Sequence, residues 1–246
     1  MSGHSHAANI AAKKAKTDAA KGKIFTKVGR EIAVAAKSNP DPDTNSKLAD
    51  AIAKAKSVNM PNENIKRCIA KAAGELSADN YEELTYEGYG PSGSAVIIKT
   101  LTDNKNRTVD YVRTAMRKHG GSLGNAGCVS FTFTTMGVIV VQRTPELDED
   151  AVMEYALEAG ADDFIAEDDA FVVHTSVSAF SGVRKYLEGK NLTFFEAQIE
   201  MVPQDRISLE GDDLAKFKRL IDALEDLDDV QEVYHNVDLP EEADEE

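Results

Sequence analysis

The chain has 246 residues, enough for one large domain or for two to three small domains that each bury a core. Hydrophobic residues make up 42% of it, and no run approaches the roughly 18 apolar residues of a membrane-spanning helix. The lysine-rich N-terminus is not followed by the apolar stretch of a signal peptide, so we expect a cytoplasmic protein without a membrane partner.

The net charge of −15 is distributed unevenly along the chain. Residues 1–75 contain 14 Lys and Arg against 7 Asp and Glu, whereas residues 76–246 contain 14 against 36. Phosphate would be attracted by the first segment and repelled by the second. The distribution therefore predicts a nucleic-acid-binding N-terminal quarter attached to an acidic remainder.

A small helical bundle is predicted for residues 1–80. Apolar residues recur at helical spacing over 24–35, two prolines interrupt the pattern at 40 and 42, and a second apolar stripe covers 48–55. Pro61 is suited to the first turn of a third helix, because that position needs no backbone N–H donor.

The pattern changes after residue 80 to alternating strands and helices, which predicts an α+β fold. We expect strands at 95–98, 129–133, 138–141, 193–201, 207–209 and 230–235, a hairpin over 164–173, and helices at 108–119, 148–158, 177–187 and 212–227. This order predicts two ferredoxin-like modules. Residues 134–204 would form one module, inserted in a second module made of 81–133 and 205–239, with a disordered acidic tail at 240–246.

The main candidate site is a cluster of basic residues in the helical quarter. Its members are Lys13, Lys14, Lys16, Lys21, Lys23, Lys27 and Arg30. Lysine ammonium groups suit phosphate, whereas guanine is usually read by arginine, and only one arginine precedes residue 67. The cluster therefore predicts contact with the nucleic-acid backbone and weak sequence specificity. The alternative is a solvated helix face without a ligand.

A second candidate is the polar segment that opens the predicted helix at 108–119. Lys105 and Arg107 lie where the backbone N–H groups of a helix N-terminus attract anions, so they could form a secondary phosphate contact. Capping of the helix by Asp103 or Asn106 explains the segment equally well.

No catalytic, metal or cofactor site is expected. His4 and His6 have no carboxylate or thiol nearby in the sequence, and Cys68 and Cys128 lack metal-binding spacing. The glycine-rich segment 86–93 lacks the Lys and Ser/Thr of a phosphate-binding loop, so we interpret it as a tight turn. The acidic pairs follow no EF-hand pattern, and no catalytic triad can be assembled.

Several unusual strings follow one another along the chain. They are GHSHAANI at 3–10, GKIFTKVGREIAVAAK at 22–37, NMPNENIKR at 59–67, YEGYGPSG at 86–93, LTDNKNRT at 101–108, KHGGSLG at 118–124 and LIDALEDLDDVQEVYHN at 220–236. With these strings the chain resembles, nearly end to end, the YebC family of probable transcriptional regulatory proteins, whose mitochondrial relatives are translational activators. The resemblance implies a helical domain and two α+β domains. The family usually has Lys and Trp at the positions of His6 and Ala7, which predicts a smaller role for the first residues.

Three functions are compatible with these observations. The first is a transcriptional regulator that binds DNA, which the resemblance favours. The second is a translation factor associated with ribosomal RNA or mRNA, which the absence of a recognisable helix-turn-helix favours. The third is an interaction scaffold without nucleic acid. We place the DNA-binding regulator first, with no small-molecule substrate, no enzymatic activity and no oligomeric state specified by the sequence.

Overall fold

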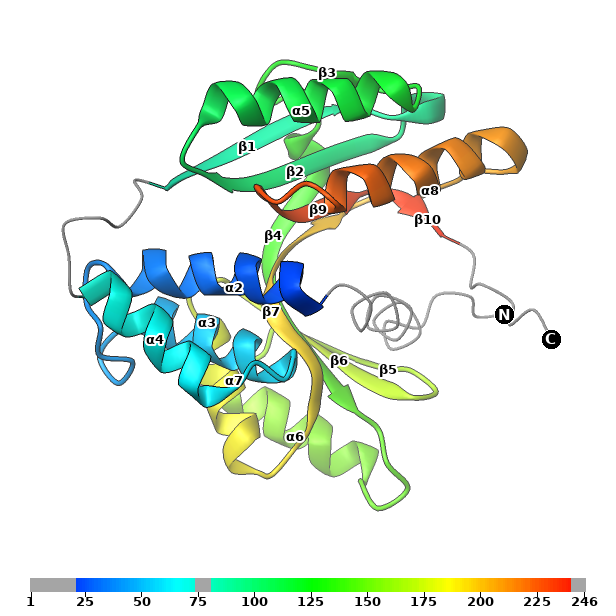
Figure 1. Cartoon of the computed structure of the whole chain (residues 1–246). Helices are drawn as coiled ribbons and strands as arrows, with labels where there is room; N and C mark the ends of the chain where they lie inside the picture. Colours follow the sequence, from blue (N-terminus) through cyan, green and yellow to red (C-terminus); the bar gives the residue numbers. More distant parts are fainter. Residues whose placement is uncertain (1–20, 74–80, 240–246) are drawn as a thin grey trace.

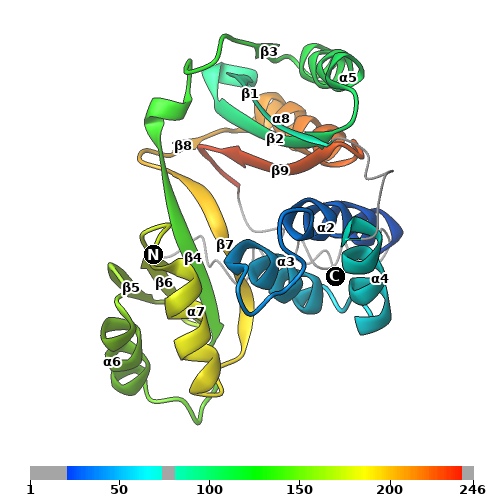
Figure 2. The same ribbon diagram turned by 90° about the vertical axis from the view of Figure 1, so that its left-hand side faces the viewer.

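The computed structural model describes residues 21–73 and 81–239, and it is an α+β structure with an N-terminal helical bundle and antiparallel sheets (Figures 1 and 2). The predicted fold class is thereby confirmed. Lys13, Lys14, Lys16, the histidines at 4 and 6, and the acidic tail lie outside the described residues.

The helical bundle consists of α2 (Lys21–Ala36), α3 (Ser46–Ser57) and α4 (Asn62–Ala73). The Asn45 side chain caps α3 by accepting a hydrogen bond from the backbone N–H of Leu48 at 3.2 Å. The helices enclose one apolar core, in which the buried side chains are Val28, Ile32, Ala36, Leu48, Ala51, Ala55, Met60, Ile65 and Ala72. The predicted apolar stripes are the faces that meet in this core.

The first sheet has the strand order β3-β1-β2-β9. Its strands are β1 (Glu82–Tyr89), β2 (Ala95–Thr102), β3 (Ser122–Leu123) and β9 (Val230–His235). Two helices, α5 (Lys105–Lys118) and α8 (Gly211–Glu225), pack on it around a core that includes Val112 and Phe217. Short parallel strands β8 (Ile207–Ser208) and β10 (Val237–Asp238) pair beside it.

The second sheet has the order β5-β6-β4-β7. It contains β4 (Phe133–Gln142), β5 (Asp163–Ala166), β6 (Ala170–Thr175) and β7 (Phe194–Pro203), together with the helices α6 (Glu149–Ala159) and α7 (Phe180–Gly189). The predicted hairpin is the β5–β6 pair. Because β9 follows this sheet in the chain yet pairs with β2, the first sheet is built from segments on both sides of the second.

Two local predictions are wrong. Residues 129–132 do not form a strand, and only Phe133 of the predicted segment does, as the first residue of β4. The Glu87 carboxylate accepts hydrogen bonds from the backbone N–H groups of Gly127, Val129 and Ser130 at 2.8–2.9 Å, and Ser130–Thr132 form a short 3-10 helix. Residues 86–89 belong to β1 and not to a turn. The tight turn lies just after them, where Gly93 has a φ of 74°.

Candidate nucleic-acid interface

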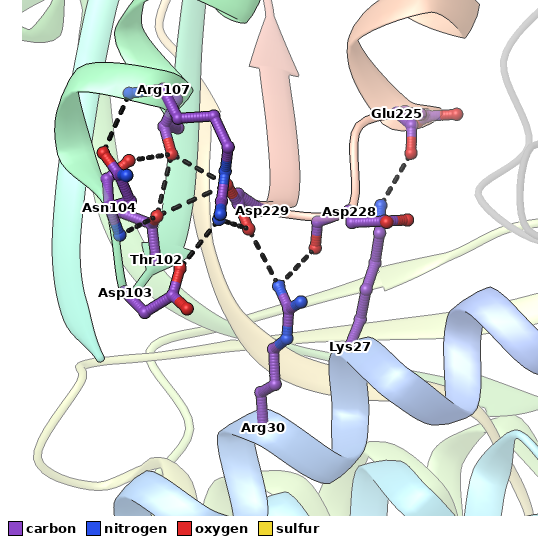
Figure 3. A network of polar contacts seen from close by, with 10 residues as sticks. Lys27, Arg30, Thr102, Asp103, Asn104, Arg107, Glu225, Asp228 and Asp229 are labelled. Atoms are coloured by element: carbon purple, nitrogen blue, oxygen red, sulfur yellow. Dashed lines mark hydrogen bonds and ion pairs between the residues drawn. The ribbon is translucent and has the colours of Figure 1, made fainter. Parts of the chain in front are cut away.

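The basic side chains of α2 point at an acidic turn that connects α8 to β9 (Figure 3). The Lys23 ammonium lies 2.9 Å from Oδ1 of Asp226, and Lys27 donates a 2.6 Å hydrogen bond to the backbone carbonyl of Glu225. That carbonyl is at the last residue of α8, where the final turn of a helix leaves C=O groups without partners and carries a partial negative charge. Lys27 thus caps α8 from another part of the chain.

Asp229 is the centre of this network, and it is 6% exposed. One carboxylate oxygen accepts from the Arg30 guanidinium at 3.0 Å, and the other accepts from Arg107 at 2.9 Å and from the Thr108 hydroxyl at 2.8 Å. Arg30 also donates to the Asp228 carbonyl at 2.8 Å. A single buried carboxylate therefore joins α2 and α5 to the turn before β9 (Figure 3).

The surroundings shift the pKa values of these groups. Burial alone would raise the pKa of Asp229, but the hydrogen bonds from Arg107 and Thr108 and the charges of both arginines outweigh it, so the pKa lies below its ordinary value. Burial lowers the pKa of Lys27, against the opposing charge of Glu225. Asp229 and Lys27 are therefore the members of the network that have lost much of their water.

A second set of ion pairs fixes α3. The Lys54 ammonium bridges Glu31 of α2 at 3.0 Å and Glu232 of β9 at 2.7 Å. One helical turn before Lys54, Asp50 accepts hydrogen bonds from the buried Arg184 of α7 at 3.1 Å and from Ser181. The helical bundle is consequently tied to both sheets.

Four of the residues predicted to bind nucleic acid are engaged within the chain. Lys23, Lys27, Arg30 and Arg107 contact the acidic turn, so phosphate would compete there with carboxylates and carbonyls. Lys21 is exposed at the start of α2. Their role toward nucleic acid stays a prediction.

The two residues of the second predicted site, Lys105 and Arg107, lie in different surroundings. Arg107 turns inward to Asp229, and its guanidinium also lies 2.7 Å from Asp103, whereas Lys105 is exposed. The helix is capped by Asn104, which accepts from the backbone N–H of Arg107 at 3.1 Å. The predicted caps Asp103 and Asn106 are therefore wrong by one and two positions.

Sequence reasoning missed a basic surface on α4. Its outward face carries Lys66, Arg67 and Lys71, all exposed, with Glu63 as the acidic residue among them. None of these three cations forms an ion pair with another residue of 21–73 or 81–239, and Lys56 at the end of α3 is exposed likewise. The signal was present, because the apolar stripe of α4 leaves these positions on the opposite side.

Two features are absent from the described part of the chain, a metal-binding cluster and a membrane-spanning helix. It contains no cluster of three or more His, Cys, Asp or Glu side chains placed to hold a metal ion. None of its helices combines the length and apolarity that crossing a bilayer requires.

The fold and its contacts define a three-part α+β protein in which a basic helical bundle is joined by ion pairs to two sheet modules. Two family models match it: the TACO1/YebC protein N-terminal domain over residues 5–75, and the TACO1/YebC second and third domain over residues 81–237. The chain belongs to the TACO1/YebC family.

Its relatives are similar along their whole length. A probable transcriptional regulatory protein of Hathewaya histolytica is 54% identical over 242 residues, or 98% of each chain, and one of Acetivibrio thermocellus is 56% identical over 96% of this chain and 98% of its own. The crystal structure of a conserved hypothetical protein from Aquifex aeolicus has a TM-score of 0.82 and 41% identity, covering 94% of this chain and 96% of that one. The names of the Hathewaya and Acetivibrio relatives support a regulatory protein.

Proposed function

We propose that the protein is a transcriptional regulator that binds duplex DNA through its N-terminal helical bundle. The observation that carries this proposal is the group of exposed cations on α4 and at the end of α3, which we call the α4 face: Lys56, Lys66, Arg67 and Lys71. In a chain with a net charge of −15, exposed cations without ion-pair partners among the described residues mark where phosphate is best tolerated. The names of the relatives support the same role.

We expect these residues to contact the phosphate backbone of DNA and not the edges of its bases. Three of the four cations are lysines, which bind phosphate as point charges, and one arginine offers few bidentate contacts to guanine. The predicted cluster Lys13, Lys14 and Lys16 would add further phosphate contacts. Lys27 and Arg30, by contrast, serve mainly to hold the bundle on the acidic turn.

The proposed function involves no catalytic step, cofactor or metal, and it would be carried out in the cytoplasm. It keeps the predicted division into a helical domain at 1–80, a discontinuous domain at 81–133 and 205–239, and an inserted domain at 134–204. The acidic surface of the two sheet modules supports it, because it would keep DNA on the bundle side of the molecule.

The test measures the affinity of the full chain for a fluorescein-labelled duplex as a function of salt. Replacing Lys66, Arg67 and Lys71 by Gln should lower the affinity and reduce the slope of log K against log salt by about 3, since each lost phosphate contact removes about 0.9. The control removes two lysines and one arginine elsewhere, with Lys185, Lys216 and Arg219 changed to Gln, all of which are exposed.

The two variants carry the same net charge, so they separate a local contact from a general charge effect. An α4 variant that keeps the wild-type slope, or a control variant that loses as much affinity, would contradict the proposal.

A further inference from the structure

A cavity of about 500 Å³ lies where the helical bundle meets both sheets. Its walls come from α2 and α3 of the bundle, from β1, β2 and β9 of the first sheet, and from β7 and α7 of the second module. The bundle, β9 and β7 are neighbours in this part of the molecule in Figure 2. A volume of this size accommodates a small organic molecule.

The charged groups in the inner part of the cavity are paired with one another. Lys54 bridges Glu31 and Glu232, and Asp50 is held by Arg184. These pairs leave little attraction for an ion of either sign. Apolar side chains fill the space between them, among them Val34, Leu84, Leu101, Phe180 and Ile199.

The other charged lining residues lie nearer to solvent. Lys47 and Glu83 are exposed and opposite in sign. The Lys99 ammonium lies 5.4 Å from the centre of the Tyr234 ring, a cation–π contact. The lining as a whole therefore favours an uncharged occupant with an apolar part.

Gln231 brings an unpaired amide to this cavity. Its Nε2 and Oε1 atoms are both shielded from solvent, and neither has a hydrogen-bond partner within 21–73 or 81–239. Other amides of the lining do have partners: Asn45 donates to the carbonyl of Ala35 at 2.8 Å. Gln198 donates to Glu200 at 3.1 Å. A buried amide without these bonds costs free energy, so it points to a ligand that supplies both the missing donor and the missing acceptor.

A β-bulge in β9 accounts for the position of Gln231. Lys99 lies opposite Glu232 and Thr100 opposite Val230, so Gln231 is an extra residue between the two pairs. Val230 belongs to the core between the first sheet and its helices, whereas Gln231 and Glu232 both line the cavity. In a regular strand, consecutive side chains would point to opposite faces. The bulge thus adds a second polar side chain to the cavity wall.

The chemical group that best completes the Gln231 amide is another amide. A primary carboxamide carries an N–H donor beside a carbonyl acceptor, so it can accept from Nε2 and donate to Oε1 at the same time. A carboxylate has only acceptors and an ammonium only donors, so either would leave one atom of Gln231 unpaired. We propose that this cavity binds a small uncharged molecule with a primary carboxamide on an apolar body, and that the carboxamide pairs with Gln231.

Such a ligand would contact the bundle and both sheet modules at once. Because the cavity exists only while these parts are assembled, the ligand would stabilise their arrangement by mass action. The residues of the α4 face do not line the cavity. The inference therefore does not depend on DNA binding by the bundle.

The experiment uses the full chain and benzamide as the probe, in a titration followed by the NMR signals of the glutamine side-chain amides. Benzamide should bind saturably and shift the Gln231 signal, which is identified by its absence in Gln231→Leu. Benzoate has the same ring with a carboxylate in place of the carboxamide, so it should bind much more weakly. The variant Gln231→Leu should weaken benzamide binding by about 5- to 140-fold, the factor for two ordinary hydrogen bonds.

The matched control is Gln204→Leu, at an exposed position outside the lining, and it should bind benzamide like the wild type. Thermal melting checks that Gln231→Leu folds, which we expect because the change removes an unpaired amide and keeps a side chain of similar size. The α4 variant should also bind benzamide normally, so a loss of duplex binding alone would concern the proposed function only.

Three results would overturn the inference. They are a wild-type chain that does not bind benzamide, benzoate that binds as tightly as benzamide, and a Gln231→Leu variant with unchanged affinity.

Discussion

Replacing Asp229 by Asn should destabilise the protein, because this carboxylate is the common partner of two arginines from different parts of the chain. The substitution keeps the shape of the side chain and one acceptor oxygen but removes the negative charge. Breaking a buried ion pair by neutralising one partner costs roughly 3–5 kcal/mol. Asp229 itself is buried, but the side chains of Arg30 and Arg107 are 19% and 38% exposed, so part of their charge is solvated after the change.

We therefore expect a loss of about 2–3 kcal/mol in the free energy of unfolding, below the fully buried range. Urea unfolding followed by far-ultraviolet circular dichroism measures it as a lower midpoint at an unchanged slope. The matched control is Asp226→Asn on the same turn. Asp226 and its partner Lys23 are 75% and 48% exposed, and exposed pairs contribute at most about 1 kcal/mol. Equal midpoints for the two variants would refute the role given to Asp229.

The pH dependence of this contribution has a definite sign. The pKa of Asp229 is depressed in the folded state, so its stabilisation is fully present above the unfolded pKa of about 3.9. It is lost as the pH falls through the folded pKa. The wild type should therefore lose its advantage over Asp229→Asn below about pH 4, as measured by urea midpoints across the acid range. A stability difference that stays constant down to the lowest pH at which both fold would contradict the assignment.

Three further changes probe other parts of the structure. Lys54→Met should cost about 2–3 kcal/mol in urea unfolding, because it leaves the Glu232 carboxylate without its cation; an unchanged midpoint would disprove that pairing. Glu87→Gln should speed hydrogen exchange at the three backbone amides that donate hydrogen bonds to the Glu87 carboxylate. Exchange at the wild-type rate would show that the segment keeps its conformation without this carboxylate. Gly137→Ala should lower the free energy of unfolding by about 1–3 kcal/mol, because its methyl group would meet Phe180 at 2.6 Å. An unchanged stability would mean that Phe180 and α7 move aside without cost.

The sequence predicts the local elements of this fold well, because their signals are local. Pro61 and the apolar stripe after it define α4, and the acidic residues at 168 and 169 mark the β5–β6 turn. The segment at 129–133 was misassigned because its alternation is typical of a strand, while its amides are captured by Glu87, about 40 residues earlier. Such a capture is a tertiary contact that no local pattern contains.

The candidate site shows the same limit more strongly. The lysines and the arginine of α2 were recognised as anion-binding groups, and they do bind anionic groups. Their partners are the carboxylates and carbonyls of residues 225–229, about 200 positions along the chain. Charge counting identifies a basic segment but cannot tell an external phosphate from an internal carboxylate. The cations at 66, 67 and 71 can be recognised as a surface only once it is known which side of α4 stays exposed to solvent when the helices pack together.

The most direct test of the central claim, that the α4 face binds DNA, is crosslinking in cells followed by sequencing of the recovered nucleic acid. It compares the wild type with the Lys66, Arg67 and Lys71 variant and with the control variant of equal charge. We predict that promoter DNA is recovered with the wild type and the control and is lost with the α4 variant. Recovery of ribosomal RNA with little promoter DNA, or promoter DNA that persists in the α4 variant, would contradict the account.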